Sequence, residues 1–153
     1  SYGLPTLPFR FFNVYGPLQS AGHAYAAVVP KFLDRIKAGK PILIEGDGEQ
    51  SRDFTSVNTV CAVLRDAVER RVVSDAPVNL AYGSMTTINE LADLVEAEVG
   101  HSITREHISP RVGDVRASTA DGLKVRELFP SIGPVELADA LPATVDWYLR
   151  GGS

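Results

Sequence analysis

Apolar residues recur with the 3.6-residue period of an amphipathic helix in several segments of the chain. The pattern predicts helices over residues 25–39, 57–71, 87–100, 121–129 and 135–149. Gly39 and Gly100 are expected to end the first and third of these helices, because glycine readily adopts the left-handed conformation that closes a helix. The third helix is expected to begin with a capping box, in which Thr87 accepts from the Glu90 amide and the Glu90 carboxylate reaches back.

The second predicted helix has an apolar face that we expect to lie against the core. Its residues are Val57, Val60, Cys61, Leu64 and Val68. Because Cys61 falls on this face, we expect a buried structural thiol there rather than a nucleophile.

Short β-prone runs alternate with the predicted helices. They cover residues 6–12, 42–44, 77–80 and 103–108, and turn-forming Gly, Pro, Asn and Asp residues flank them. Strands that alternate with helices indicate an α/β chain.

The composition excludes several classes of protein. The 153 residues are 44% hydrophobic and 22% charged, which suits a globular domain. A net charge of −4 argues against nucleic acid as a partner, and no apolar run approaches the roughly 18–20 residues of a membrane span. The single cysteine excludes an intrachain disulfide and fits a reduced, cytoplasmic setting. One cysteine and three scattered histidines also give no reason to expect a metal site.

The candidate chemistry lies in arginines next to glycine-rich or acidic turns. They are Arg10, Arg52, Arg111 and Arg116. A guanidinium binds phosphate oxygens in a bidentate manner, so several on adjoining loops could hold a diphosphate. A carboxylate such as Asp114 could instead accept from the hydroxyls of a ribose. The alternative is that these are ordinary surface ion pairs, for example between Arg52 and Asp53.

Five short motifs occur in an order that resembles a known family. They are FFNVYGP at 11–17, VVPKF at 28–32, GDGEQSRDF at 46–54, PRVGDVR at 110–116 and AD at 120–121. Together they resemble the C-terminal part of the NAD-dependent epimerase/dehydratases, which are extended short-chain dehydrogenase/reductases. The nearest likeness within the family is to UDP-glucose 4-epimerase-like enzymes.

The resemblance implies an α/β fold that combines the end of a Rossmann-type parallel sheet with a smaller mixed α/β substrate-binding domain. Residues 1–17 would be the last part of the NAD-binding Rossmann domain, and residues 18–153 the nucleotide-sugar domain. The runs at 42–44, 77–80 and 103–108 would build this smaller domain.

The resemblance also assigns roles to individual residues. Phe12 would contact the cofactor NAD, and Asn13 would contact the substrate. Val29, Pro30 and Lys31 would line the uracil pocket, Arg52 and Arg111 would clamp the diphosphate, and Asp114 would bind the ribose of the UDP-sugar.

The chain lacks the family's glycine-rich NAD turn and its catalytic Tyr-x-x-x-Lys pair. We therefore expect no catalytic residue in this chain, which would be the substrate-binding half of a longer enzyme and inactive alone. Its partners would be a UDP-sugar and the N-terminal half, within a homodimer. The implied reaction inverts the sugar at C4 through a 4-keto intermediate.

Other readings remain open at this point. A nucleotide-sugar 4,6-dehydratase or a UDP-glucuronate decarboxylase would share the same motifs. Decarboxylase relatives tend to have serine in place of Asp53, and dehydratases tend to have tryptophan in place of Phe54, so both positions favour an epimerase. A non-catalytic nucleotide-binding module or a purely structural domain is the alternative outside the enzyme class.

Overall fold

The structure is a computed structural model that describes residues 3–20, 22 and 27–151. All five predicted helices are present in it, although the expected start of the first, near Tyr25, lies outside the described residues. The helices are α1 (Val28–Lys37), α2 (Val57–Arg70), α3 (Ile88–Val99), α4 (Leu123–Leu128) and α5 (Leu137–Leu149). No helix in this part of the chain is long and apolar enough to cross a membrane.

The strands are short, and four of them coincide with the predicted β-prone runs, although one of them, ending at Glu45, extends one residue past its run. These four are β1 (Phe9–Phe11), β3 (Ile42–Glu45), β6 (Val78–Leu80) and β8 (Arg105–Ile108). The others comprise two residues each: β2 (Val14–Tyr15), β4 (Ser51–Arg52), β5 (Thr55–Ser56), β7 (Thr86–Thr87) and β9 (Ala117–Ser118). Two residues are too few to show an alternating pattern, so the sequence did not indicate them.

Strand pairing is mostly parallel, as expected for an α/β chain. β1 pairs with β6, β2 with β5, and β3 with β8, all in parallel, whereas β4 lies between antiparallel β7 and parallel β9. The run at 77–80, which the resemblance placed in the smaller domain with 42–44 and 103–108, thus pairs instead with β1, in the part assigned to the Rossmann domain. Val78 and Leu80 are fully buried opposite Phe9 and Phe11, beneath α2 and α4, which accounts for the pairing with β1.

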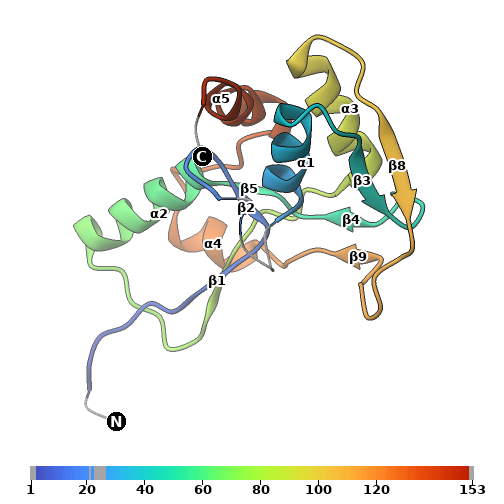
Figure 1. Ribbon diagram of the computed structural model, residues 1–153. Coiled ribbons are helices and arrows are strands. Elements are labelled where there is room, and N and C mark those ends of the chain that lie inside the picture. Colours follow the sequence, from blue (N-terminus) through green and yellow to red (C-terminus); the bar gives the residue numbers. More distant parts are fainter. Residues whose placement is uncertain (1–2, 21, 23–26, 152–153) are drawn as a thin grey trace.

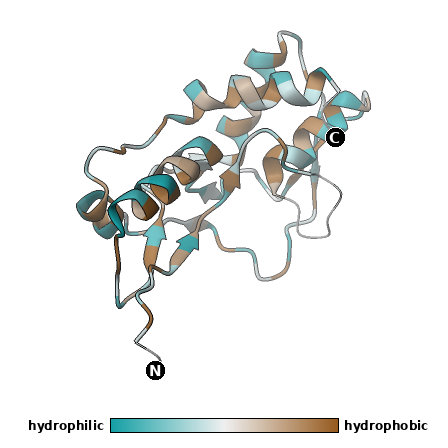
Figure 2. Ribbon diagram, turned by 90° about the vertical axis from the view of Figure 1, so that its left-hand side faces the viewer, coloured by the Kyte–Doolittle hydropathy of each residue, from teal (hydrophilic) through white to brown (hydrophobic). Residues whose placement is uncertain are grey.

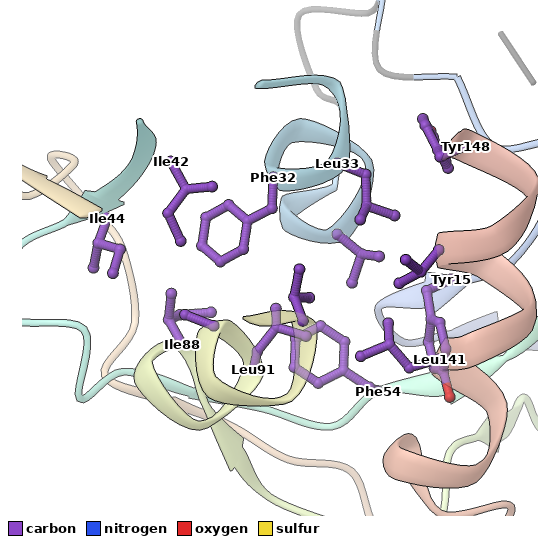
Figure 3. Close-up of a cluster of buried hydrophobic side chains, with 14 residues drawn as sticks. Tyr15, Phe32, Leu33, Ile42, Ile44, Phe54, Ile88, Leu91, Leu141 and Tyr148 are labelled. Atoms are coloured by element: carbon purple, nitrogen blue, oxygen red, sulfur yellow. The ribbon is translucent and has the colours of Figure 1, made fainter. Parts of the chain in front are cut away.

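Two hydrophobic clusters hold the chain together. The first joins α1, α3 and α5 with β3, and the side chains of Phe32, Ile42, Leu91 and Leu141 converge in it (Figure 3). The second lies between α2, β6 and α4 on the other side of the molecule (Figure 1). Segments of the two clusters alternate along the chain, so neither is one continuous piece of sequence.

The buried face of α2 differs from the predicted one. Thr59, Val60, Val63 and Ala67 are buried, whereas Cys61 is exposed and Val68 is 77% exposed. The prediction of a buried thiol at Cys61 is thus wrong. The helix carries two apolar stripes at helical spacing, and the one containing the small Ala67 packs against β6 and α4. Figure 2 shows the mixture of hydrophobic and hydrophilic positions along the helices.

Candidate functional site

A pocket of about 190 Å³ opens between α1, β3, β4 and the start of α3. Residues from widely separated parts of the sequence line it: Asn13, Ala27, Val28, Lys31, Leu43, Glu45, Gln50, Arg52, Phe54, Ile88, Arg111 and Asp114. Five of the predicted site residues are in this set, namely Asn13, Lys31, Arg52, Arg111 and Asp114. The structure thus brings most of the predicted site together in one place.

Arg52 reaches the pocket because β4 alternates its side chains between two faces. The neighbouring Asp53 is fully buried on the other face, where its carboxylate accepts from the Gly83 amide at 2.8 Å and the Ser84 hydroxyl at 3.4 Å. Arg52 pairs instead with Asp114, its Nη2 lying 2.5 Å from Asp114 Oδ1. The surface ion pair between Arg52 and Asp53, which the sequence left open, is therefore not formed.

Backbone carbonyls further fix the Arg52 guanidinium. Its Nη1 donates to the carbonyl oxygens of Ser51 and Val115, both at 2.8 Å. The side chain of Arg52 is only 13% exposed and that of Asp114 is 32% exposed. These contacts tie β4 to the loop that carries Asp114.

That loop, residues 109–116, is anchored to the glycine-rich turn at 46–48. Arg116 Nη1 lies 3.1 Å from Asp47 Oδ2. A hydrogen bond from the Glu49 backbone amide lowers the pKa of the exposed Asp47 carboxyl below its usual range, and the hydrogen bond from Arg116 lowers it further. Arg116 thus anchors the loop to the turn. The exposed Arg111 instead lines the pocket and makes no ion pair within the described residues.

The first residues of α3 contact the turn at 46–48. The predicted capping box is confirmed: the Glu90 amide donates to Thr87 Oγ1 at 3.1 Å, and the Thr87 amide donates to Glu90 Oε2 at 2.7 Å. The Asn89 side-chain amide donates to the Asp47 carbonyl at 3.0 Å and to Glu49 at 2.7 Å. The cap therefore places α3 where it can hold this turn.

Asn13 adopts a left-handed backbone conformation, with φ of 32°, which asparagine tolerates better than most residues. Its side-chain amide donates to the Asp53 carbonyl at 3.1 Å. This bond links the segment after β1 to the segment after β4. Asn13 thus lines the pocket with part of its hydrogen-bonding capacity already used.

The first turn of α1 presents a different set of residues to the pocket from the one predicted. Val29 is fully buried in the first cluster and Pro30 is buried, whereas Val28 and Lys31 line the pocket. Residues three apart share a helix face, so Val28 accompanies Lys31, while Val29 shares the core face with Phe32 and Leu33. Val29 and Pro30 are therefore not among the residues that line this pocket.

Sequence reasoning missed several other lining residues, among them Glu45 and Gln50. Gln50 lies within the GDGEQSRDF motif, and its amide donates to the Glu45 carbonyl at 2.8 Å. The motif was the signal that could have identified Gln50. Arg10 is exposed on β1 and Phe12 is half-buried just after it, and neither is among the residues that line the pocket.

Fold and site together define an α/β protein with a cationic pocket suited to a phosphorylated ligand. The sequence model of the NAD dependent epimerase/dehydratase family matches residues 1–96. The chain belongs to this family.

Individual relatives agree with this assignment. A UDP-glucuronate 4-epimerase of Thermodesulfobacterium geofontis is 31% identical over 95% of this chain and 44% of its own length. A solved structure of UDP-N-acetylglucosamine 4-epimerase from Methanobrevibacter ruminantium, bound to UDP-N-acetylmuramic acid, matches with a TM-score of 0.86 and 36% identity, over 98% of this chain and 48% of that one. A UDP-glucuronic acid 4-epimerase of Bacillus cereus, solved with UDP-glucuronic acid and NAD, gives 0.85 and 26%, over 98% and 47%.

The chain spans about half the length of the relatives that it matches. They include more than epimerases: a dTDP-glucose 4,6-dehydratase of Xanthomonas campestris is 26% identical over 97% of this chain and 44% of its own length. The family is NAD dependent. The sequence has no G-x-G-x-x-G turn, and Phe12, the residue that the family resemblance assigns to NAD, is half-buried.

Proposed function

We propose that this chain is the substrate-binding half of an NAD-dependent nucleotide-sugar epimerase of the UDP-glucose 4-epimerase type. Its pocket would hold the nucleoside diphosphate of a UDP-sugar. The observation that carries the proposal is the convergence of Arg52 and Arg111, 59 positions apart in the sequence, on one pocket with Lys31 and Asp114. Three cations against two acids, Glu45 and Asp114, leave this pocket with a positive balance suited to a diphosphate.

Each residue has a task that its chemistry supports. The Arg52 and Arg111 guanidinium groups would donate paired hydrogen bonds to diphosphate oxygens, and Asp114 would accept from the ribose hydroxyls. Val28 would offer an apolar wall to the base, with the stem of Lys31 beside it. Held by its diphosphate, the substrate could turn its hexose without leaving the protein.

The chain would work only together with the rest of the enzyme. The Tyr-x-x-x-Lys pair that performs acid/base chemistry in this family does not occur in this sequence. We propose that residues 1–17, with β6 paired to β1 in the same sheet, complete the Rossmann domain of a companion N-terminal half. The rest of residues 18–153 would form the substrate domain, and the full enzyme would be a cytoplasmic homodimer. The chain alone would bind nucleotide and catalyse nothing.

Calorimetric titration of the chain with UDP, dTDP and GDP tests the proposal. Arg52→Ala and Arg111→Ala should each weaken UDP binding by about 1.5–3 kcal/mol, because each removes charge-assisted bonds to the diphosphate. Arg65→Ala is the matched control, since Arg65 is exposed on α2, its side chain 76% exposed, and is not among the lining residues. No binding of any nucleotide, or equal losses in all three variants, would leave a structural domain as the better reading.

A 4,6-dehydratase is the second candidate, because a relative of this chain carries that name. Phe54 favours an epimerase, because dehydratases of this family tend to have tryptophan at this position. The Phe54 ring is buried and packs edge-on against Tyr15, with ring centroids 6.3 Å apart at 85°. The full-length enzyme separates the two reactions. An epimerase converts a nucleotide-sugar to an isomer of the same mass, whereas a dehydratase releases one water, so mass spectrometry of the product decides between them.

A further inference from the structure

The two residues proposed to bind different parts of the substrate bind each other in this structure. Arg52 Nη2 lies 2.5 Å from Asp114 Oδ1, and both side chains line the same pocket. A guanidinium has five N–H donors, of which Arg52 uses two on backbone carbonyls and one on Asp114. Two donors therefore remain for a ligand, and the cationic charge is already compensated.

Asp114 takes part in the same contact through one of its two carboxylate oxygens. Its side chain is 32% exposed and faces the pocket, where Arg52 is its ion-pair partner. A ligand that carries only an anion would bind Arg52 and so weaken the ion pair between Arg52 and Asp114. The Asp114 carboxylate would then lie beside a second negative charge. A ligand that carries only hydroxyl groups would draw on Asp114 and leave Arg52 less well compensated. Each partial ligand thus loses part of what it gains.

We propose that the Arg52–Asp114 ion pair makes this pocket selective for ligands that combine a phosphate with a neighbouring sugar diol. Such a ligand gives the guanidinium an anion and the carboxylate two hydroxyl donors in one event. The ion pair then couples recognition of the two groups: the phosphate, by binding Arg52, makes Asp114 available to the diol, and the diol, by binding Asp114, makes Arg52 available to the phosphate. This inference rests on the proposed nucleotide site and adds the means by which the site distinguishes a nucleotide from a simple phosphate.

Arg111 supplies the contrast that makes the idea testable. It lines the same pocket and has no ion-pair partner within the described part of the chain. Its charge is available to any anion, whereas that of Arg52 is shared with Asp114. Removal of the carboxylate should consequently release Arg52 and leave Arg111 as it was.

Inorganic pyrophosphate is the probe, because it has the phosphates of UDP and no sugar. We expect Asp114→Asn and Asp114→Ala to strengthen pyrophosphate binding by about tenfold in calorimetric titration at fixed ionic strength, a coupling typical of linked sites. The ratio of UDP affinity to pyrophosphate affinity should fall by at least as much. Asp66→Asn is the matched control, since Asp66 forms an equally short pair with Arg70 on α2, 2.5 Å from Nη2, and is not among the lining residues.

A second comparison separates release of Arg52 from simple relief of charge repulsion. In an Arg52→Ala background, the gain in pyrophosphate binding from Asp114→Asn should be smaller, because only relief of repulsion between the carboxylate and the anion remains. A gain of the same size there would overturn the proposal, and so would weaker or unchanged pyrophosphate binding in Asp114→Asn alone. The proposed function fails separately, if UDP does not bind the unaltered chain.

Discussion

At the scale of single residues, two buried tyrosines show how differently a hydroxyl can be accommodated. Tyr15 is 1% exposed, and its hydroxyl has no hydrogen-bond partner among the described residues. Tyr148 is 3% exposed, and its hydroxyl donates to the Gln19 carbonyl. Both rings belong to the first hydrophobic cluster (Figure 3). The two positions are therefore a matched pair for measuring the worth of one buried hydroxyl bond.

Removing each hydroxyl should have a different effect on stability. Tyr148→Phe should lower the free energy of unfolding by about 1 kcal/mol, because the Gln19 carbonyl loses its donor. Tyr15→Phe should leave it unchanged or raise it by up to about 1 kcal/mol, because it removes a buried polar group that lacks a partner. Urea unfolding at neutral pH checks both. A larger loss in Tyr15→Phe than in Tyr148→Phe would contradict the structure.

Ionisation of Tyr15 should lower the free energy of unfolding in alkaline solution. Burial, together with the charges of Asp139 and Glu136, raises the pKa of Tyr15 to about 12 from an ordinary value near 10. Below pH of about 10 the phenol is neutral in both the folded and the unfolded state. Above this pH the phenol ionises first in the unfolded chain. Because the unfolded state then binds fewer protons, the free energy of unfolding falls as the pH rises.

The expected loss reaches about 2–3 kcal/mol by pH of about 12, at 1.36 kcal/mol for each pKa unit. Burial also raises the pKa of Tyr82 and Tyr148, so Tyr15→Phe should reduce the alkaline slope without abolishing it. Urea unfolding across this pH range measures the slope. An identical slope in Tyr15→Phe would show that the phenol ionises as readily in the folded state.

The sequence predicted residue chemistry better than it predicted residue contacts. Arg52, Arg111 and Asp114 could be singled out because they lie next to glycine-containing turns and carry groups that bind phosphates or hydroxyls. That Arg52 bonds Asp114 rather than Asp53 depends on which face of β4 each side chain occupies. Likewise, Val28 and Val29 are identical in sequence, and only the docking of α1 decides which one faces the pocket.

At the scale of elements, the turn at 46–48 depends on a close approach between backbone and side chain. Gly48 has φ of 79°, and a Cβ there would lie 2.1 Å from Asn89 Oδ1 and 2.6 Å from Asn89 Cγ. Asn89 holds this turn from the start of α3. An alanine at position 48 would therefore be strained and would also displace Asn89.

Gly39 provides the control for that strain, because its φ is 64° and nothing lies within 4 Å of its would-be Cβ. Gly39→Ala should cost about 1–2 kcal/mol for the left-handed conformation alone. Gly48→Ala should cost about 1–2 kcal/mol more, through lost Asn89 hydrogen bonds, and should weaken UDP binding as well. Thermal unfolding of both variants checks the difference. Equal costs would show that Asn89 moves aside without penalty.

Element prediction succeeded where the period was long enough to be read. α3 was predicted together with its cap and its closing glycine, because twelve residues carry several helical repeats and a local signal at each end. The two-residue strands around Arg52 could not be found in this way. The strand that contains Arg52, β4, is defined by its pairing with β7 and β9, which are distant in sequence, and no local pattern contains that information.

At the scale of the whole molecule, the pocket lies beside the first cluster, while β1 and β6 belong with the second. The chain passes between the two clusters repeatedly, and residues 46–54 and 109–116 approach each other at the pocket. The family resemblance predicted the architecture that alternation alone could name only as α/β. It could not predict how the clusters share the chain, because that depends on long-range pairing.

Binding of a nucleoside diphosphate in this pocket, through Arg52 and Arg111, is the proposal on which the assigned function depends. The most direct measurement is a crystal structure of the chain grown with UDP. We expect diphosphate oxygens at about 2.7–3.2 Å from guanidinium nitrogens of both arginines, with the ribose hydroxyls hydrogen-bonded to Asp114. UDP ordered elsewhere on the molecule, or in this pocket with its diphosphate away from both arginines, would contradict it.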